Sequence, residues 1–262
     1  MSSARTLRLR PVKKGLPAGR VSLARALSKL GAATRKTARV LIAEGRVRVN
    51  GRHALDPDAW INLNSDVISI DHMRVVQREF RYLAFHKPTD VVTTRSDERG
   101  RRTVYDVLGS AGTDLRTVGR LDKDSTGLLL LTNDNRLADC LTDPRSRMPK
   151  VYLVKTSRPL SQQEVRQIER GMDIQLEGAS YRTKPAAVRV VDEVTYEISL
   201  TEGKNRQVRR MVKALGADVL SLVRVSIGPV ALGTLPVGSW RELEPSEMNA
   251  LKQYCRSGAV LP

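Results

Sequence analysis

The sequence predicts an α+β protein in which a small basic module precedes a larger, strand-rich domain. Apolar residues recur at helical spacing between residues 21 and 42, whereas from Tyr82 onward they alternate or form short runs typical of strands. The second region shows no βαβ rhythm and no phosphate-binding GxGxxG motif, which favours a mixed, largely antiparallel sheet. We therefore predict a basic tail at residues 1–18, a small α/β module at 19–76 and a strand-rich domain at 77–262.

Two helices and a hairpin are expected in the module. A helix with leucines at every third or fourth position ends at Gly31, and a second helix begins after the N-cap Thr34. The stretch RVRVNGR then alternates as a half-exposed strand does, and its Asn50-Gly51 pair predicts a tight turn. A further strand is predicted at residues 67–70.

The charge of the chain indicates a polyanionic partner. Lysine and arginine total 45 against 28 acidic residues, so the formal net charge is +17. Cations that bind phosphates release condensed counterions, so this surplus favours a nucleic-acid partner over a merely soluble basic protein. Bases four residues apart share a helix face, and Glu44 is the only acid between Arg20 and Asn50. In preference to a solvated helix face, we predict a phosphate-binding face formed by Arg25, Lys29, Arg35, Lys36 and Arg39.

Composition argues against several other classes of protein. Cys140 and Cys255 are far apart without a CxxC motif, and the three histidines are scattered, so neither a disulfide framework nor a metal site is expected. No apolar run reaches the length of a membrane span. Aromatic residues make up only 4% of the chain, too few for a platform that stacks single strands. We expect no cofactor, and a protein of the reducing cytoplasm.

The second domain reads mainly as short strands with two helices. One helix begins at Ser161, where Glu164 completes a capping box, and ends at Gly171. Another begins near Asn205. The linker and the entry strand fall at 73–81, and further strands are predicted at 116–121, 128–131, 150–155, 186–191 and 195–200.

A charged turn directly precedes the most apolar run of the chain, in GRLDKDSTGLLLLTND at 119–134. Asp122 stands where a strand leaves the core, and four leucines follow shortly after it. An ordinary Asx-type turn would explain a single aspartate, but it would not explain the Arg-Leu-Asp-Lys-Asp cluster. Apolar flanking strands can hold a carboxylate near a low-dielectric surface, where its reactivity is tuned. Asp122 is therefore a candidate for a tuned, functional carboxylate.

A basic amphipathic helix is predicted in TEGKNRQVRRMVKALG at 201–216, with Asn205 as its cap. Its apolar stripe contains Val208, Met211, Val212 and Leu215, at about 100° per residue. An ordinary amphipathic helix accounts for most of its bases, which are otherwise candidates for phosphate contacts: Arg206, Arg210 and Lys213. Arg209 falls at the edge of the apolar stripe, so it is the arginine best placed to pair with a partly buried carboxylate.

Two family resemblances rest on these motifs. The segment LSKLGAATRKTARVLIAEGRVRVNG resembles the S4-like RNA-binding module, which reads shaped RNA. The GRLD and NRQVRR motifs together resemble the bacterial ribosomal RNA pseudouridine synthases of the RsuA type, many of which carry such a module at the N-terminus. The resemblance implies that Asp122 is the catalytic aspartate and that Arg209 pairs with it. We expect Leu128 to Leu131 to provide an apolar surface that partly desolvates this pair and strengthens it.

The resemblance also implies the reaction, which isomerises a uridine to pseudouridine without a metal or a cofactor. The uridine leaves its stack, Asp122 attacks the ribose or abstracts a proton, and the base is re-attached through carbon 5. Tyr152 of the Lys-x-Tyr motif would stack on the extruded base, while Arg120 would stabilise the opened site. Lys150 of the same motif is a candidate RNA contact.

Two positions depart from the family pattern near its Lys-Pro motif and its leucine run. Lys87-Pro88 matches the motif, but Asp90 stands where a glycine is usual, and Asn135 replaces the glycine that usually follows Thr-Asn-Asp. Aspartate and asparagine tolerate a positive φ better than most residues. We therefore expect the loop shapes to survive and substrate choice to be the property affected.

The resemblance implies a structured stem-loop of ribosomal RNA as substrate, free or in a pre-ribosomal particle, with 23S RNA slightly favoured over 16S RNA. We expect a monomer, without a membrane partner. One alternative is a non-catalytic RNA-binding or ribosome-assembly factor, which would not need Asp122. Another is a DNA-binding regulator with a helix-turn-helix at residues 21–45, which would leave the Asn-Gly hairpin and the strand-rich domain unexplained.

Overall fold

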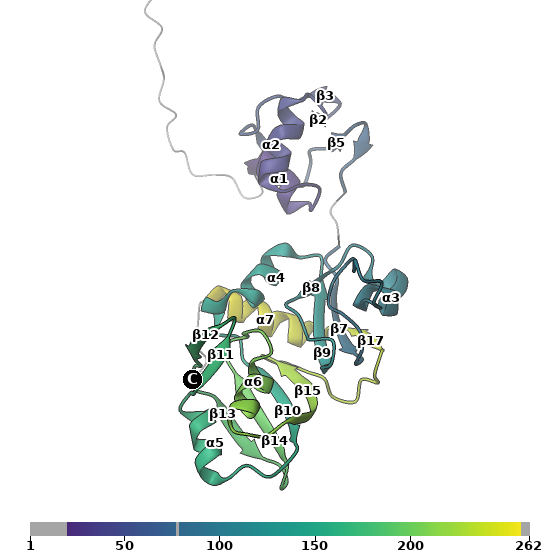
Figure 1. The fold of residues 1–262 in the computed structure, drawn as a ribbon. Coiled ribbons are helices and arrows are strands. Elements are labelled where there is room, and N and C mark those ends of the chain that lie inside the picture. The colour runs from purple at the N-terminus through teal and green to yellow at the C-terminus, as the bar shows by residue number, and fades with distance from the viewer. Residues whose placement is uncertain (1–19, 77–78, 258–262) are drawn as a thin grey trace, which may run out of the picture. The chain divides into compact units, whose positions relative to one another are not determined.

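The computed structural model describes residues 20–76 and 79–257, and the chain divides into two compact units between Glu79 and Phe80 (Figure 1). The residues predicted as a basic tail lie outside the described residues. Each unit has a hydrophobic core of its own. No helix in the described residues is long and apolar enough to cross a membrane.

The N-terminal unit packs two helices, α1 (Leu23–Lys29) and α2 (Arg35–Ala43), on short strands. The predicted N-cap is confirmed, because the Thr34 hydroxyl accepts a hydrogen bond from the Thr37 amide at 3.1 Å. Gly31 follows the first helix with φ +74°, a conformation that favours glycine. The strands are β1 (Arg20–Ser22), β2 (Val47–Val49), β3 (Arg52–His53), β4 (Trp60–Asn62), β5 (Ile68–Ile70) and β6 (Met73–Arg74).

A nine-stranded sheet forms the centre of the second unit, with the order β13-β14-β10-β15-β9-β7-β17, while β8 pairs with β9 and β16 with β15. Only the β15–β9 pair among these is parallel, so the predicted mixed, largely antiparallel sheet is confirmed. The strands are β7 (Tyr82–Lys87), β8 (Arg116–Val118), β9 (Thr126–Thr132), β10 (Lys150–Thr156), β13 (Ala187–Val190), β14 (Thr195–Leu200), β15 (Val219–Ile227), β16 (Val230–Ala231) and β17 (Trp240–Glu242). A separate hairpin consists of β11 (Asp173–Leu176) and β12 (Ala179–Arg182).

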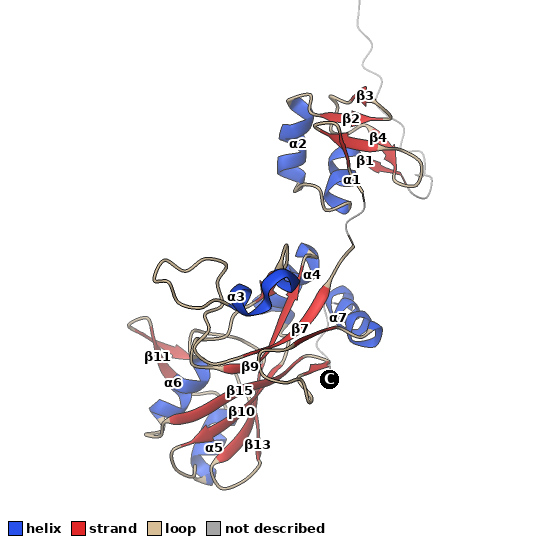
Figure 2. Ribbon diagram, turned by 90° about the vertical axis from the view of Figure 1, so that its right-hand side faces the viewer, coloured by secondary structure: helices blue, strands red, loops and turns tan. Residues whose placement is uncertain are grey.

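Helices lie toward both ends of this sheet (Figure 2). Helix α5 contacts β13, and α6 contacts β11 and β15, whereas α4 contacts β8, β9 and α7. The capping box predicted at Ser161 and Glu164 is confirmed at the start of α5. The helices are α3 (Val104–Leu108), α4 (Asn135–Thr142), α5 (Gln162–Glu169), α6 (Gln207–Ala214) and α7 (Pro245–Ser257), with short 3-10 turns η1 (Gly109–Gly112) and η2 (Pro144–Ser146).

Two local expectations are wrong. Helix α6 is not capped by Asn205. The N-cap position is occupied by Arg206, which has a left-handed conformation and makes no side-chain cap hydrogen bond. Asn135 does not take a positive φ but begins α4, for which the Asp134 carboxylate is the N-cap. The same expectation holds for Asp90, whose φ is +60°.

The leucine run has a different role from the one expected. Strand β9 lies inside the sheet, and its side chains alternate between two cores because successive strand residues face opposite sides. Leu128 and Leu130 pack in the core that includes α4 and α7, whereas Leu129 and Leu131 pack in the core that includes α3. None of the four lines the pocket beside Asp122. The leucines therefore anchor the strand that follows Asp122 rather than desolvating its carboxylate.

The sequence expectation of unpaired cysteines is also wrong. Cys140 on α4 and Cys255 on α7 form a disulfide across a sequence separation of 115 residues, with their Cα atoms 6.0 Å apart. Spacing in the chain gave no indication of this contact, because only the packing of α4 against α7 brings the two residues together. The disulfide therefore links the C-terminal helix α7 to α4, which packs against β8 and β9.

Reduction of this disulfide should destabilise the protein. A crosslink that closes a long loop restricts the unfolded chain, and its loss typically costs about 2–4 kcal/mol. We expect reductant to lower the midpoint of chemical denaturation of the wild-type protein. The Cys255→Ser variant should unfold at the lower midpoint with or without reductant. A wild-type midpoint that is the same in both conditions would contradict the disulfide.

Candidate active site

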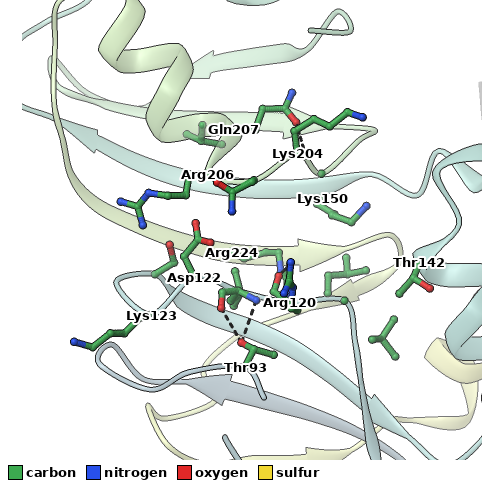
Figure 3. Close-up of a pocket in the computed structure, with 18 of the residues that line it drawn as sticks. Thr93, Arg120, Asp122, Lys123, Thr142, Lys150, Lys204, Arg206, Gln207 and Arg224 are labelled. Atoms are coloured by element: carbon green, nitrogen blue, oxygen red, sulfur yellow. Dashed lines mark hydrogen bonds between the residues drawn. The ribbon is translucent and has the colours of Figure 1, made fainter. Parts of the chain in front are cut away.

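A pocket of about 710 Å³ opens in the second unit where the loop between β8 and β9 meets β10, β15 and the loop before α6. Four of the residues singled out from the sequence line it, and Arg206 joins them from the loop before α6; all of these except Tyr152 are labelled in Figure 3. These four are Arg120, Asp122, Lys150 and Tyr152. The tertiary fold therefore gathers side chains from three separate segments around one cavity.

A buried lysine holds the turn that carries Asp122. The Lys87 side chain is fully buried at the end of β7, and its ammonium donates to the carbonyl of Pro88 at 2.8 Å and to that of Ser125 at 2.9 Å. Burial lowers the pKa of Lys87 to about 8, while the carboxylates of Asp122 and Asp124 favour its charged form. The lysine of the Lys-Pro motif therefore has a structural role, because it joins the end of β7 to the turn.

A second set of bonds fixes the residue that precedes Asp122. The Thr93 hydroxyl donates to the Leu121 carbonyl at 2.7 Å and accepts from the Leu121 amide at 3.2 Å (Figure 3). The turn itself is closed by the Ser125 amide, which donates to the Asp122 carbonyl at 3.1 Å. With its backbone held on both sides, Asp122 presents a half-buried carboxylate to the pocket.

Arg209 does not pair with Asp122, contrary to expectation. Its guanidinium donates to the Asp124 carbonyl at 2.8 Å and to the Val219 carbonyl at 3.2 Å, and its Nε lies 3.4 Å from the Asp124 carboxylate. Arg206 forms a two-pronged ion pair with the same carboxylate, at 2.8 and 2.9 Å. The pKa of Asp124 is lowered by the hydrogen bonds from Arg206 and by the charge of Arg209. The helix therefore clamps the second aspartate of the turn, and the first faces the pocket.

Two further predicted phosphate contacts on α6 have protein partners. Arg210 donates to the carbonyls of Gln175 at 2.6 Å and Asn205 at 3.0 Å, so it links the helix start to the β11–β12 hairpin. Lys213 forms an exposed ion pair with Asp218 at 2.9 Å. Neither residue lines the pocket. In the N-terminal unit, all five predicted contacts are exposed on α1 and α2, namely Arg25, Lys29, Arg35, Lys36 and Arg39.

Two buried charged residues at the site were missed by the sequence reasoning. Glu202 accepts from the Tyr181 hydroxyl and the Gln207 amide, both at 2.7 Å, and so fixes the loop that leads to Arg206. Arg224 is only 2% exposed on β15 and donates to the Leu128 carbonyl at 2.7 Å. One indication of Arg224 was visible, because it is a single charge inside the otherwise uncharged and mostly apolar stretch at 219–227.

Close backbone approach explains where Arg224 sits. Strands β9 and β15 pair in parallel, with Gly127 opposite Arg224. Gly127 has φ +111°, and a Cβ there would overlap the Arg224 backbone. Only glycine permits this contact, which brings β15 against the strand that follows Asp122.

Comparison with known proteins identifies the family. The model for the RNA pseudouridylate synthase family matches residues 81–214, the part that carries Asp122, Tyr152 and Arg209, and the S4 domain model matches residues 21–59. The chain belongs to the RNA pseudouridylate synthase family. The resemblance to the RsuA type with an N-terminal S4 domain is thereby confirmed, and the protein is a pseudouridine synthase that acts on RNA.

Similar proteins share both units of this pseudouridine synthase. An uncharacterized RNA pseudouridine synthase of Aquifex aeolicus is 35% identical over 231 residues, covering 86% of this chain and 91% of that protein. The ribosomal large subunit pseudouridine synthase B of Bacillus subtilis is 34% identical over 242 residues, covering 90% and 97%. A crystal structure of a pseudouridylate synthase matches with a TM-score of 0.63 and 30% identity, covering 88% of this chain and 99% of that one.

Proposed function

We propose that this enzyme converts one uridine of 23S ribosomal RNA to pseudouridine, with Asp122 as the catalytic residue. The observation that carries the proposal is the pocket, in which the half-buried Asp122 carboxylate and the Tyr152 ring line one cavity. The large-subunit assignment is supported by the name of the Bacillus subtilis relative, a ribosomal large subunit pseudouridine synthase, and by a 34% identical protein of Vibrio cholerae with the same name.

Each residue then has a role that its position allows. The extruded base enters the pocket and stacks on Tyr152, while the exposed Arg120 at the pocket helps to hold the opened RNA. Asp122 acts at the ribose, either as nucleophile at carbon 1′ or as the base that begins a glycal route. Arg209 is a positioning residue, since it acts through Asp124 rather than on the substrate. The enzyme works as a cytoplasmic monomer on a stem-loop of free or pre-ribosomal RNA.

Mapping on transcripts tests this proposal directly. Unmodified 16S and 23S transcripts are incubated with wild-type protein or with Asp122→Asn, and pseudouridine is located by carbodiimide treatment and primer extension. We expect a single new stop on the 23S transcript that is absent with Asp122→Asn. A stop on the 16S transcript would overturn the large-subunit assignment. If no stop appeared on either transcript or on assembly intermediates, a non-catalytic assembly factor would be favoured.

The basic helices of the N-terminal unit should supply RNA affinity without affecting the chemistry. Arg35 and Arg39 are exposed on α2, and the exposed ion pair between Arg39 and Asp58 is open to exchange for a phosphate. The double variant Arg35→Ala/Arg39→Ala should bind RNA more weakly, with a salt dependence that is shallower by about 1.5 in log–log slope. Filter binding over a salt series measures this slope. Unchanged binding at every salt concentration would show that this face does not contact RNA.

A further inference from the structure

Two cations that line the pocket form no ion pair with a carboxylate among the residues that the structure describes. Arg224 donates Nε to the Leu128 carbonyl at 2.7 Å and Nη1 to the Arg120 carbonyl at 3.4 Å, while its buried Nη2 has no partner in the part of the chain that the structure describes. Lys150 donates to the Met148 carbonyl at 3.0 Å. Both side chains line the pocket together with Asp122 (Figure 3).

The strand register places these two cations beside Tyr152. Tyr152 on β10 is directly opposite Arg224 on β15, so their side chains project from the same face of the sheet. Lys150 lies two residues before Tyr152 on the same strand, and both keep regular pairing with β14, so Lys150 also shares that face. The ring that the proposed function assigns to the target base therefore has two cationic neighbours on the same face of the sheet.

Burying these charges together is unfavourable without an anion. Burial and the neighbouring Arg224 guanidinium lower the pKa of Lys150 to about 8, which is the direction expected for two adjacent cations. A buried charge without a partner costs far more than a paired one. The nearby acid Asp124 is already held by Arg206 and Arg209. Asp122, which lines the same pocket, forms no ion pair with Arg224 or Lys150 in the described part of the chain. An anionic ligand at the pocket floor would compensate this cost.

We propose that Arg224 and Lys150 form an anion site that stabilises the uracil as it leaves the ribose, with Arg224 Nη2 as the principal donor. The inference rests on the proposed function. When the bond between ribose carbon 1′ and base nitrogen 1 breaks, its electron pair stays on the base, and the negative charge spreads over nitrogen 1 and the carbonyl oxygens. Carbon 5 later returns the pair to carbon 1′, the proton on carbon 5 leaves to solvent, and nitrogen 1 takes up a proton from solvent, so the reaction remains an isomerisation. Donors preset where charge develops lower the barrier, because they need no reorganisation.

A backbone phosphate is the less favoured ligand for this site. Arg224 is only 2% exposed, and it lies opposite the tyrosine assigned to the base. The exposed arginines that line the same pocket, Arg120 and Arg206, are accessible to a phosphate of the extruded nucleotide. The depth of Arg224 therefore matches the base rather than the backbone.

The test compares uridine with 5-fluorouridine in the same RNA. Fluorine withdraws electrons, so 5-fluorouracil carries the developing charge more easily and should depend less on the two cations. Transcripts made with either nucleotide are incubated with wild-type enzyme, Arg224→Gln, Lys150→Gln and the control Lys155→Gln, an exposed lysine on the same strand. Single-turnover loss of the parent nucleoside at the mapped position is measured by mass spectrometry, and RNA Kd is measured in parallel.

We expect Arg224→Gln to slow the uridine reaction by about 10²-fold and Lys150→Gln by about 10-fold, with both losses several-fold smaller on the fluorinated RNA. The RNA Kd should stay near that of wild type, and Lys155→Gln should match wild type throughout. Arg224→Gln also removes hydrogen bonds to two carbonyls, so its loss of rate could have a structural cause. Lys150→Gln leaves those bonds in place, so its loss of rate reports on the anion site alone. Equal losses on both RNAs, or a loss confined to Kd as a phosphate contact requires, would overturn the anion site. Failure of the proposed function is distinct, since wild-type enzyme would then convert neither RNA.

Discussion

Asp122→Asn should abolish pseudouridine formation while leaving RNA binding intact. The substitution preserves the size of the side chain but removes the charge that either route requires, as nucleophile or as base. Loss of such a group slows a reaction by about 10³-fold or more. RNA Kd should change by less than about threefold, because phosphate contacts elsewhere supply most of the affinity. Single-turnover release of tritium from carbon 5 of labelled uridine, together with filter binding, measures both quantities.

The matched control is Asp124→Asn, two residues away on the same turn. Its carboxylate is held by Arg206 and Arg209 rather than presented free to the pocket. Losing these partly exposed ion pairs should loosen the turn and slow the reaction by only about tenfold. If Asp124→Asn were inactive and Asp122→Asn retained activity, the assignment of the two aspartates would have to be exchanged.

Lys87→Met should reduce turnover by about 10²-fold, the size of effect that follows from displacing a catalytic group by about 1 Å. Methionine fills the buried space but cannot donate to the carbonyls of Pro88 and Ser125, which hold the Asp122 turn. RNA Kd should change little, because the side chain is fully buried. Lys155→Met, an exposed substitution on β10, is the control. Wild-type turnover in Lys87→Met would show that the turn does not need this lysine.

The same variant should alter how stability depends on pH. The pKa of Lys87 is about 8 in the folded protein and 10.5 when unperturbed. Between these values the unfolded chain holds more protons on this group than the folded chain does, so raising the pH favours the folded state. The free energy of unfolding of the wild type should therefore rise between about pH 8 and 10. Lys87→Met should show a smaller rise, with Lys150 still contributing its share.

Local features of the fold were predictable because they depend on neighbouring residues. The Thr34 cap, the capping box of Ser161 and Glu164, and the strand at residues 195–200 follow from side-chain chemistry and periodicity within a few positions. The start of α6 was misjudged, because its first turn is set by the Arg206–Asp124 ion pair from a distant loop. Helices α4 and α7 were not predicted at all.

The candidate site was likewise predictable only in part. Asp122 stood out because a charged cluster next to an apolar run is unusual in any sequence. The surroundings of Asp122 could not be predicted, because Lys87 and Arg224 reach the turn through strand pairing and Thr93 reaches it from a loop. The role predicted for the leucine run was wrong, because a run of apolar residues does not reveal which face of a sheet lies beside a pocket.

The sequence by itself determined the family, the order of the two domains and the identity of the aspartate, because motifs and charge are properties of neighbouring residues. Only the tertiary structure decided which aspartate Arg206 and Arg209 hold, that Cys140 meets Cys255, and that Arg224 and Lys150 share a sheet face with Tyr152. Each of these contacts joins segments far apart in the chain. Their partners are selected by sheet register and helix packing, and these depend on the whole core rather than on any one stretch of it.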